Sequence, residues 1–136
     1  MNAWYLDTSA FVKLVRVERY STPLRRWVVG RETAGDVIAS SDLLRTEAIR
    51  SARRVQDPAV LDVVVSLLDR IAIVQLDASV FEKAGYLGPS SLRSLDALHL
   101  AAAQELGADL SGVVAYDERL LNAASQLGLE TIAPKR

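Results

Sequence analysis

The chain has 136 residues, half of them apolar and 24% charged, and this composition indicates a folded domain with a substantial core. It has no cysteine and one histidine, which excludes disulfides, thiolate metal sites and a multi-histidine zinc site. The formal net charge of −1 gives no overall basic field that would point to nucleic acid. The apolar runs are too short to cross a bilayer, and Asp7 interrupts the first of them too early for a signal peptide. We therefore expect a single cytoplasmic domain spanning residues 1–136.

The first predicted element is a buried strand that ends at Asp7. Residues 3–6 are apolar without interruption, which is typical of a central strand in a parallel sheet. Thr8 and Ser9 follow, and both are good N-cap residues for a helix over residues 8–15. Asp7 thus lies where a strand ends and a helix begins, at the edge where open α/β sheets bind their ligands. The alternative is that Asp7 only caps the helix.

The rest of the chain alternates between helical and strand patterns. This alternation implies βαβ crossovers, and therefore a short parallel sheet covered by helices on both faces. The predicted fold class is α/β, a three-layer α/β/α sandwich. Further helices are predicted over residues 20–29, 41–55, 57–70, 77–85, 94–107 and 117–128, and further strands over residues 37–39, 71–76, 113–116 and 131–133.

Three more carboxylates stand out against apolar surroundings. Asp117 follows a predicted strand, and Asp96 lies in the first turn of an almost entirely apolar helix. Glu47 shares a helix face with small and apolar residues and therefore points inward. Taken singly, each has a structural explanation: a helix cap for Asp117, a helix-dipole contact for Asp96, and an ion pair along its own helix for Glu47. Together with Asp7 they need a joint explanation.

A divalent metal ion explains the four carboxylates together. Two like charges about 4 Å apart repel by about 4 kcal/mol at an effective dielectric near 20, so such groups take up protons or bind cations. An all-oxygen ligand set favours Mg²⁺ or Mn²⁺ over zinc. These ions usually share their coordination shell with substrate phosphates, which makes phosphodiester hydrolysis the natural chemistry.

Four segments carry these carboxylates: Leu6-Asp7-Thr8-Ser9-Ala10, then Glu47 after Leu43-Leu44-Arg45-Thr46, Ser94-Leu95-Asp96-Ala97-Leu98-His99-Leu100-Ala101, and Val114-Ala115-Tyr116-Asp117-Glu118-Arg119-Leu120. In their order and spacing they resemble the acidic motifs of PIN-domain ribonucleases, most closely those of VapC-type toxins from bacterial toxin–antitoxin pairs. The resemblance implies a Mg²⁺- or Mn²⁺-dependent endoribonuclease, with the four carboxylates holding the metal. It also implies an RNA substrate, a homodimer and a cognate VapB-type antitoxin that blocks the site.

Other polar side chains near these motifs are candidates for contact with the substrate. Thr8 and Ser9 are candidates for orienting the first aspartate or a water, in addition to capping the helix. Arg93 and Arg119 are placed to meet substrate phosphates, unless they are solvated surface charges. His99 lies one turn after the acidic residue of its helix, and it either faces the site or packs in the core.

A partner surface is expected near Phe11 and Trp27. The chain is rich in apolar residues for its length, and the resemblance implies an antitoxin. An apolar groove at the first helices is therefore the predicted docking site, although core packing also accounts for Trp27.

Two other functions are compatible with the sequence. A phosphatase would use Asp7 as its nucleophile, but that chemistry calls for a second aspartate two residues later, where Ser9 stands. A non-catalytic module would keep the PIN-like fold and only bind RNA or protein. The intact set of carboxylates argues against this second alternative.

Overall fold

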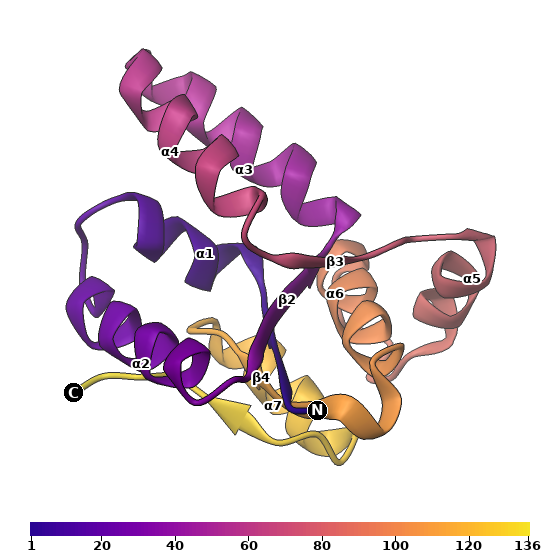
Figure 1. Cartoon of the computed structure of the whole chain (residues 1–136). Helices are drawn as coiled ribbons and strands as arrows, with labels where there is room; N and C mark the ends of the chain where they lie inside the picture. Colours follow the sequence, from indigo (N-terminus) through magenta and orange to yellow (C-terminus); the bar gives the residue numbers. More distant parts are fainter.

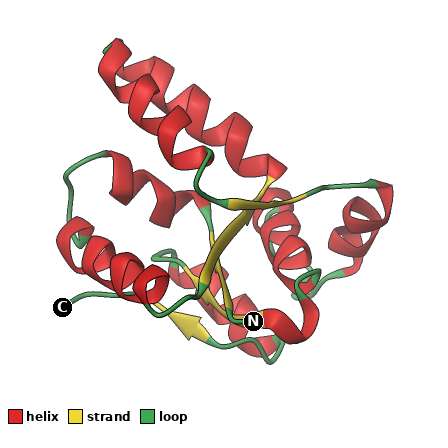
Figure 2. Cartoon of the chain, in the orientation of Figure 1, coloured by secondary structure: helices red, strands yellow, loops and turns green.

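The computed structural model describes residues 1–136, and its chain folds into five strands and seven α-helices (Figures 1 and 2). The strands are β1 (Ala3–Leu6), β2 (Val37–Ser41), β3 (Ala72–Val74), β4 (Leu110–Val114) and β5 (Thr131–Ile132). The helices are α1 (Thr8–Val15), α2 (Ser21–Thr33), α3 (Asp42–Val55), α4 (Pro58–Leu68), α5 (Ala78–Tyr86), α6 (Ser94–Gln104) and α7 (Glu118–Gln126).

The strands form one parallel sheet in the order β3-β2-β1-β4-β5. β1 lies at the centre, and the chain builds the sheet outward from it in both directions. The carboxyl end of β1 is therefore a topological switch point, the place where parallel α/β sheets bind ligands. Leu6 pairs with Val114, so the segments that follow β1 and β4 leave the sheet side by side.

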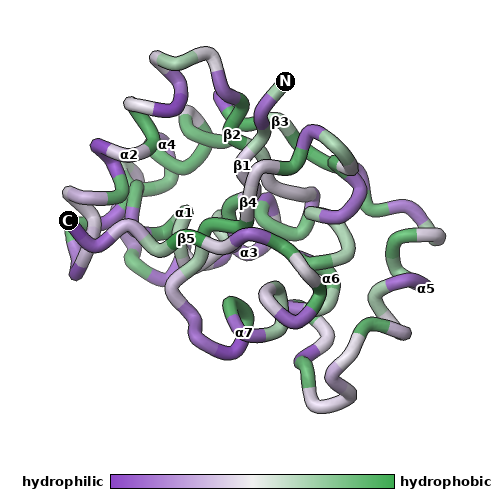
Figure 3. The backbone as a smooth tube through the Cα atoms, turned by 90° about the horizontal axis from the view of Figure 1, so that it is seen from below, coloured by the Kyte–Doolittle hydropathy of each residue, from purple (hydrophilic) through white to green (hydrophobic).

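Helices cover both faces of the sheet, which confirms the predicted three-layer α/β/α arrangement. Figure 1 shows α1 and α2 on one side of the strands and α5 and α6 on the other. The side chains of β1 alternate between the two layers: Tyr5 packs in the cluster of Leu100 and Leu120, and Leu6 packs in the cluster of Leu24 and Ala10. Figure 3 shows hydrophobic stretches along the central strands and hydrophilic ones in the outlying turns.

The α3–α4 pair projects beyond the sheet as a helical hairpin (Figure 1). It has its own apolar cluster, in which Leu44 and Val64 pack around Phe11 of α1. Asp57 caps α4 by accepting a hydrogen bond from the N–H of Ala59 at 3.0 Å, as its Asp-Pro start predicts. α3 begins directly after β2, so its first turns lie close to the sheet.

Some predicted boundaries are wrong by a few residues. Ser41 belongs to β2 rather than to the following helix, because it pairs with Val74 of β3. β4 begins at Leu110, earlier than residue 113, because it pairs with Ala3 at that point. α6 ends at Gln104, before a short 3₁₀ turn, rather than at residue 107.

α2 also differs from its prediction: it begins at Ser21, after Tyr20 in a left-handed conformation, and continues to Thr33. Ser94 is the first residue of α6 and not its cap, a position that Arg93 occupies without a side-chain hydrogen bond. No helix combines the length and the apolar character that crossing a membrane would need.

Candidate active site

A polar pocket of about 330 Å³ opens where β1 and β4 end, and it contains all four carboxylates singled out in the sequence. Two of them follow the neighbouring central strands, one lies in the first turn of α6, and one reaches in from α3. The carboxylates are joined in the lining by three more of the candidate residues and by His99. The lining residues are Asp7, Thr8, Ser9, Glu47, Arg93, Ser94, Leu95, Asp96, His99 and Asp117.

Asp7 is the one fully buried carboxylate of the four, at 5% exposure. Its Oδ1 accepts a hydrogen bond from the N–H of Ala10 at 2.9 Å, which caps α1. The hydroxyl of Ser9 donates to Oδ1 and Oδ2 at 2.8 and 2.9 Å. Burial raises the pKa of Asp7, and these hydrogen bonds offset that effect only in part. Asp7 therefore caps its helix and also places a costly negative charge at the pocket.

Glu47 is held by a hydrogen-bonded network that crosses the pocket floor. The hydroxyl of Thr8 donates to its Oε1 at 2.5 Å, and Nε2 of His99 lies 3.0 Å from the same oxygen. Nδ1 of His99 lies 2.7 Å from the hydroxyl of Tyr5 in the sheet. Burial alone would raise the pKa of Glu47, but the hydrogen bonds from His99 and Thr8 outweigh it and lower the pKa. The network therefore favours an ionised and oriented Glu47.

Asp117 lies close enough to Asp96 to affect the ionisation of the Asp96 carboxyl group. Burial, and after it the charge of Asp117, raises the pKa of Asp96. Asp117 is exposed and caps α7, accepting from the N–H of Arg119 at 2.8 Å and of Leu120 at 3.3 Å. Asp117, like Asp7, therefore caps a helix and also lines the pocket.

The remaining predicted side chains divide between two neighbouring cavities. Ser9 contacts Asp7 as expected, whereas Thr8 bonds to Glu47 instead. Arg93 lines the carboxylate pocket, but Arg119 lines only the adjoining cavity. Although the four carboxylates surround one pocket, no three acidic or histidine side chains lie close enough together to hold one ion as they stand.

Sequence reasoning missed one member of the network and left another undecided. Tyr5 lies within the buried strand predicted over residues 3–6, and that strand pattern gave no indication that its hydroxyl contacts His99. His99 is buried at 3% exposure and also lines the pocket, so both of its expected roles apply. The spacing of His99 and Asp96 on one helix face was the available signal for the pocket role.

The profile of the PIN domain matches residues 4–126, a span that contains all four carboxylates. The chain belongs to the PIN-domain family. Two relatives from Mycobacterium tuberculosis place it among the VapC ribonucleases of that family. Ribonuclease VapC47 is 39% identical over 130 residues, covering 96% of each chain. Ribonuclease VapC46 is 40% identical over 141 residues, covering 98% of this chain and 99% of that protein.

Solved structures share the PIN-domain fold at much lower identity. VapC20 from Mycobacterium tuberculosis, described as a sarcin-ricin loop cleaving toxin, gives a TM-score of 0.72 at 17% identity over 96% of this chain and 99% of its own. VapBC2 from Rickettsia felis, solved bound to a DNA fragment from its promoter, gives a TM-score of 0.72 at 16% identity, covering 96% and 98%. The fold of this PIN domain is therefore shared with solved structures at only 16–17% sequence identity.

Proposed function

We propose that this PIN-domain protein hydrolyses RNA phosphodiester bonds as a metal-dependent endoribonuclease, the toxin of a toxin–antitoxin system. One observation carries the proposal: four carboxylates from four separate segments line a single pocket at the switch point of the sheet. The identity of about 40% to VapC ribonucleases over nearly the whole chain supports the same activity.

The donor set of the pocket fits Mg²⁺ or Mn²⁺. It offers carboxylate and hydroxyl oxygens, and its one imidazole is already engaged with Glu47 and Tyr5. We assign Asp7, Asp96 and Asp117 as ligands, with Glu47 completing the shell directly or through water. When bound, the ion supplies an activated water and neutralises charge on the scissile phosphate.

The residues of the chain itself prepare the site in two ways. Ser9 fixes both oxygens of Asp7, while Thr8 and His99 hold Glu47 ionised, so these two carboxylates are oriented before the substrate arrives. Arg93 is exposed at the pocket, and its guanidinium is suited to bidentate contact with a phosphate of the RNA. Ser9, Thr8 and His99 therefore position the carboxylates, and Arg93 supplies a positive charge for the RNA phosphate.

The alternative functions find less support in the pocket. A phosphatase with Asp7 as its nucleophile calls for a second aspartate two residues later, whereas the residue at that position, Ser9, donates to both oxygens of Asp7. A non-catalytic module would have no need for carboxylates whose pKa is raised by burial, as is the case for Asp7 and Asp96.

Incubation of the purified protein with total RNA tests the proposal. Endonucleolytic cuts should form with Mn²⁺ or Mg²⁺ and should cease with EDTA, and no covalent phospho-aspartate should accumulate. Cleavage that is equal in EDTA would overturn the metal-dependent mechanism. A trapped phosphate on Asp7 would favour the phosphatase alternative, and the absence of any cleavage would favour the binding module.

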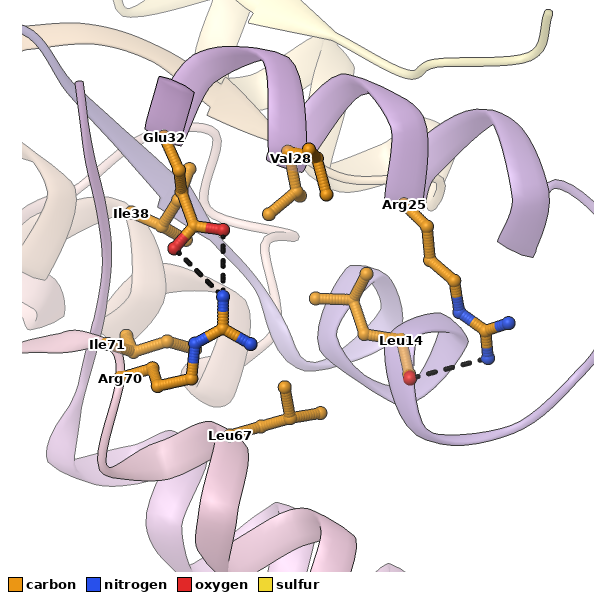
Figure 4. Close-up of a pocket in the computed structure, with 9 residues that line it drawn as sticks. Leu14, Arg25, Val28, Glu32, Ile38, Leu67, Arg70 and Ile71 are labelled. Atoms are coloured by element: carbon orange, nitrogen blue, oxygen red, sulfur yellow. Dashed lines mark hydrogen bonds and ion pairs between the residues drawn. The ribbon is translucent and has the colours of Figure 1, made fainter. Parts of the chain in front are cut away.

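A cognate VapB-type antitoxin is the proposed protein partner, and an apolar groove between α1, α2 and α4 is its proposed docking site. The groove has a volume of about 230 Å³ and is shown in Figure 4. Arg70 and Glu32 form an ion pair of 3.1 Å across its rim, and Arg25 contacts the carbonyl of Leu14 at 3.5 Å. An apolar segment with charged flanks would match this lining. The apolar members of the lining are Leu14, Val28, Val29, Ile38, Leu67 and Ile71.

The two residues expected to mark this groove lie elsewhere. Phe11 is fully buried beneath the α3–α4 hairpin. Trp27 packs edge-on against Trp4, with ring centroids 5.0 Å apart. We still propose a groove at the first helices, but neither Phe11 nor Trp27 is among the residues that line it.

A homodimer in the cytoplasm, where RNA is available, completes the proposal. Phe81 and Tyr86 of α5 and Leu95 of α6 are large apolar side chains that remain 50–87% exposed. Leu95 also lines the carboxylate pocket, so a second copy packed here would border the active site. Light scattering on the purified toxin measures the predicted twofold mass, and Phe81→Lys should reduce it to that of a monomer.

A further inference from the structure

A second polar cavity, of about 440 Å³, adjoins the carboxylate pocket. Arg93 and Asp96 line both cavities, so they form the wall between them. The volume lies within the range of about 300–1,000 Å³ that is usual for small-ligand sites. An RNA strand whose phosphate reaches the carboxylates would therefore extend directly into this second cavity.

Helix α7 supplies half of the polar residues that line the second cavity. Arg119, Asn122 and Gln126 are spaced by three and four residues, so they share one face of the helix. The opposite face of α7 is anchored in the core by Leu120 and Ala124. A rigid helix therefore presents the three side chains, rather than a loop.

These polar side chains are available to a ligand. Asn122, Gln126 and Arg119 are exposed, and their side chains make no hydrogen bond or ion pair within the protein. Only the backbone N–H of Arg119 is engaged, by Asp117 at 2.8 Å. A solvated surface would explain their exposure, but not their shared position in a cavity that continues the active site.

The chemistry of the lining matches an unpaired nucleotide. A side-chain amide donates and accepts at once, as the edges of the nucleobases do, and asparagine and glutamine are common base-reading residues. The guanidinium groups of Arg93 and Arg119 suit the flanking phosphates. Apart from Asp96 at the shared wall, no acidic side chain lines the cavity, so little there repels an RNA backbone.

We propose that this cavity binds the nucleotide next to the scissile phosphate, and that Asn122 and Gln126 determine which base is accepted there. The inference rests on the proposed RNA cleavage and adds the specificity of the same site. Arg93 and Arg119 contribute affinity that does not depend on the base.

Mapping of RNA cleavage ends with the Asn122→Ala and Gln126→Ala variants tests this assignment. The wild type should prefer one base at a fixed position beside the cut. Each variant should lose about tenfold or more of that preference, as expected for the loss of a bidentate base contact, while cleavage at other bases changes little. The matched control is Ser125→Ala, which alters an exposed residue of α7 outside the cavity and should keep the preference.

The outcomes separate this inference from the proposed function. If the wild type does not cut RNA, the proposed function fails. If it cuts RNA but shows no base preference beside the cut, or if both variants keep the preference, only this inference is overturned. Variants that lose antitoxin binding but keep the base preference would assign the cavity to the protein partner instead. Thermal melts of each variant establish that folding is unchanged.

Discussion

Removing the imidazole of His99 should destabilise the protein through its buried partner in the sheet. His99 is 3% exposed and lies 2.7 Å from the hydroxyl of Tyr5, which is itself fully buried. His99→Ala leaves the Tyr5 hydroxyl without its hydrogen-bond partner, at a cost of about 1–3 kcal/mol. It also truncates a buried ring, at a cost of about 3 kcal/mol. We expect the free energy of unfolding to fall by about 4 kcal/mol, out of a total of about 5–15 kcal/mol for a domain.

A double-mutant cycle isolates the contact between the two residues. Tyr5→Phe alone should cost about 1–2 kcal/mol, because Nδ1 of His99 loses its partner. In the His99→Ala background the same change should be nearly neutral. The loss of unfolding free energy in the double variant should therefore be smaller than the sum of the two single losses by about 1–2 kcal/mol.

Guanidinium denaturation at neutral pH measures all four members of the cycle. Ser125→Ala, an exposed change on α7, serves as the control and should shift the free energy of unfolding by less than about 0.5 kcal/mol. Additivity of Tyr5→Phe and His99→Ala to within about 0.5 kcal/mol would refute the reasoning, since residues without a shared contact behave in that way.

Three further outcomes are expected. Because burial raises the pKa of Asp7, its contribution to stability is present below its unfolded pKa and is lost as the pH rises through its folded pKa. Asp7→Asn should therefore raise the metal-free melting temperature more at pH 7.5 than at pH 4, and an equal effect at both would contradict this. Mn²⁺ at about a hundred times its Kd should stabilise the wild type by about 2.7 kcal/mol, or roughly 10 °C, and Asp7→Asn should remove most of that shift; a wild type that ignores millimolar metal would count against the site. Leu67→Glu, in the apolar groove, should weaken capture of the antitoxin at least about tenfold without changing RNA cleavage, whereas Val65→Glu on the exposed side of α4 should leave capture unchanged. Equal capture by the two variants would exclude the groove.

The fold class and the position of two carboxylates were predictable because their signals are local. Asp7 and Asp117 each follow an apolar strand, and parallel strands bring such positions to one edge of a sheet. The inward face of α3 likewise indicated that Glu47 points into the protein. These features depend on the period of the apolar pattern, which a sequence displays directly.

The contacts that hold the carboxylates in place were not predictable in the same way. Tyr5 and His99 are 94 residues apart, and nothing in either segment specifies that their side chains meet. The apolar character of Phe11 was evident, but not that the α3–α4 hairpin covers it. The sequence pattern predicts the start of β4 at residue 113, whereas the strand begins at Leu110. Leu110 joins the strand because it pairs across the sheet with Ala3, a partner far away in the chain.

The rate of RNA cleavage by Asp96→Asn tests the central claim most directly. The substitution preserves the shape of the side chain and removes only its charge, at a position where burial and Asp117 already raise the pKa of the carboxyl group. With saturating Mn²⁺ we predict a fall of at least about a hundredfold, roughly 2.7 kcal/mol of barrier, while Asp62→Asn on the exposed side of α4 cleaves like the wild type. Cleavage by Asp96→Asn at the wild-type rate would contradict the assignment of this carboxylate to the metal site.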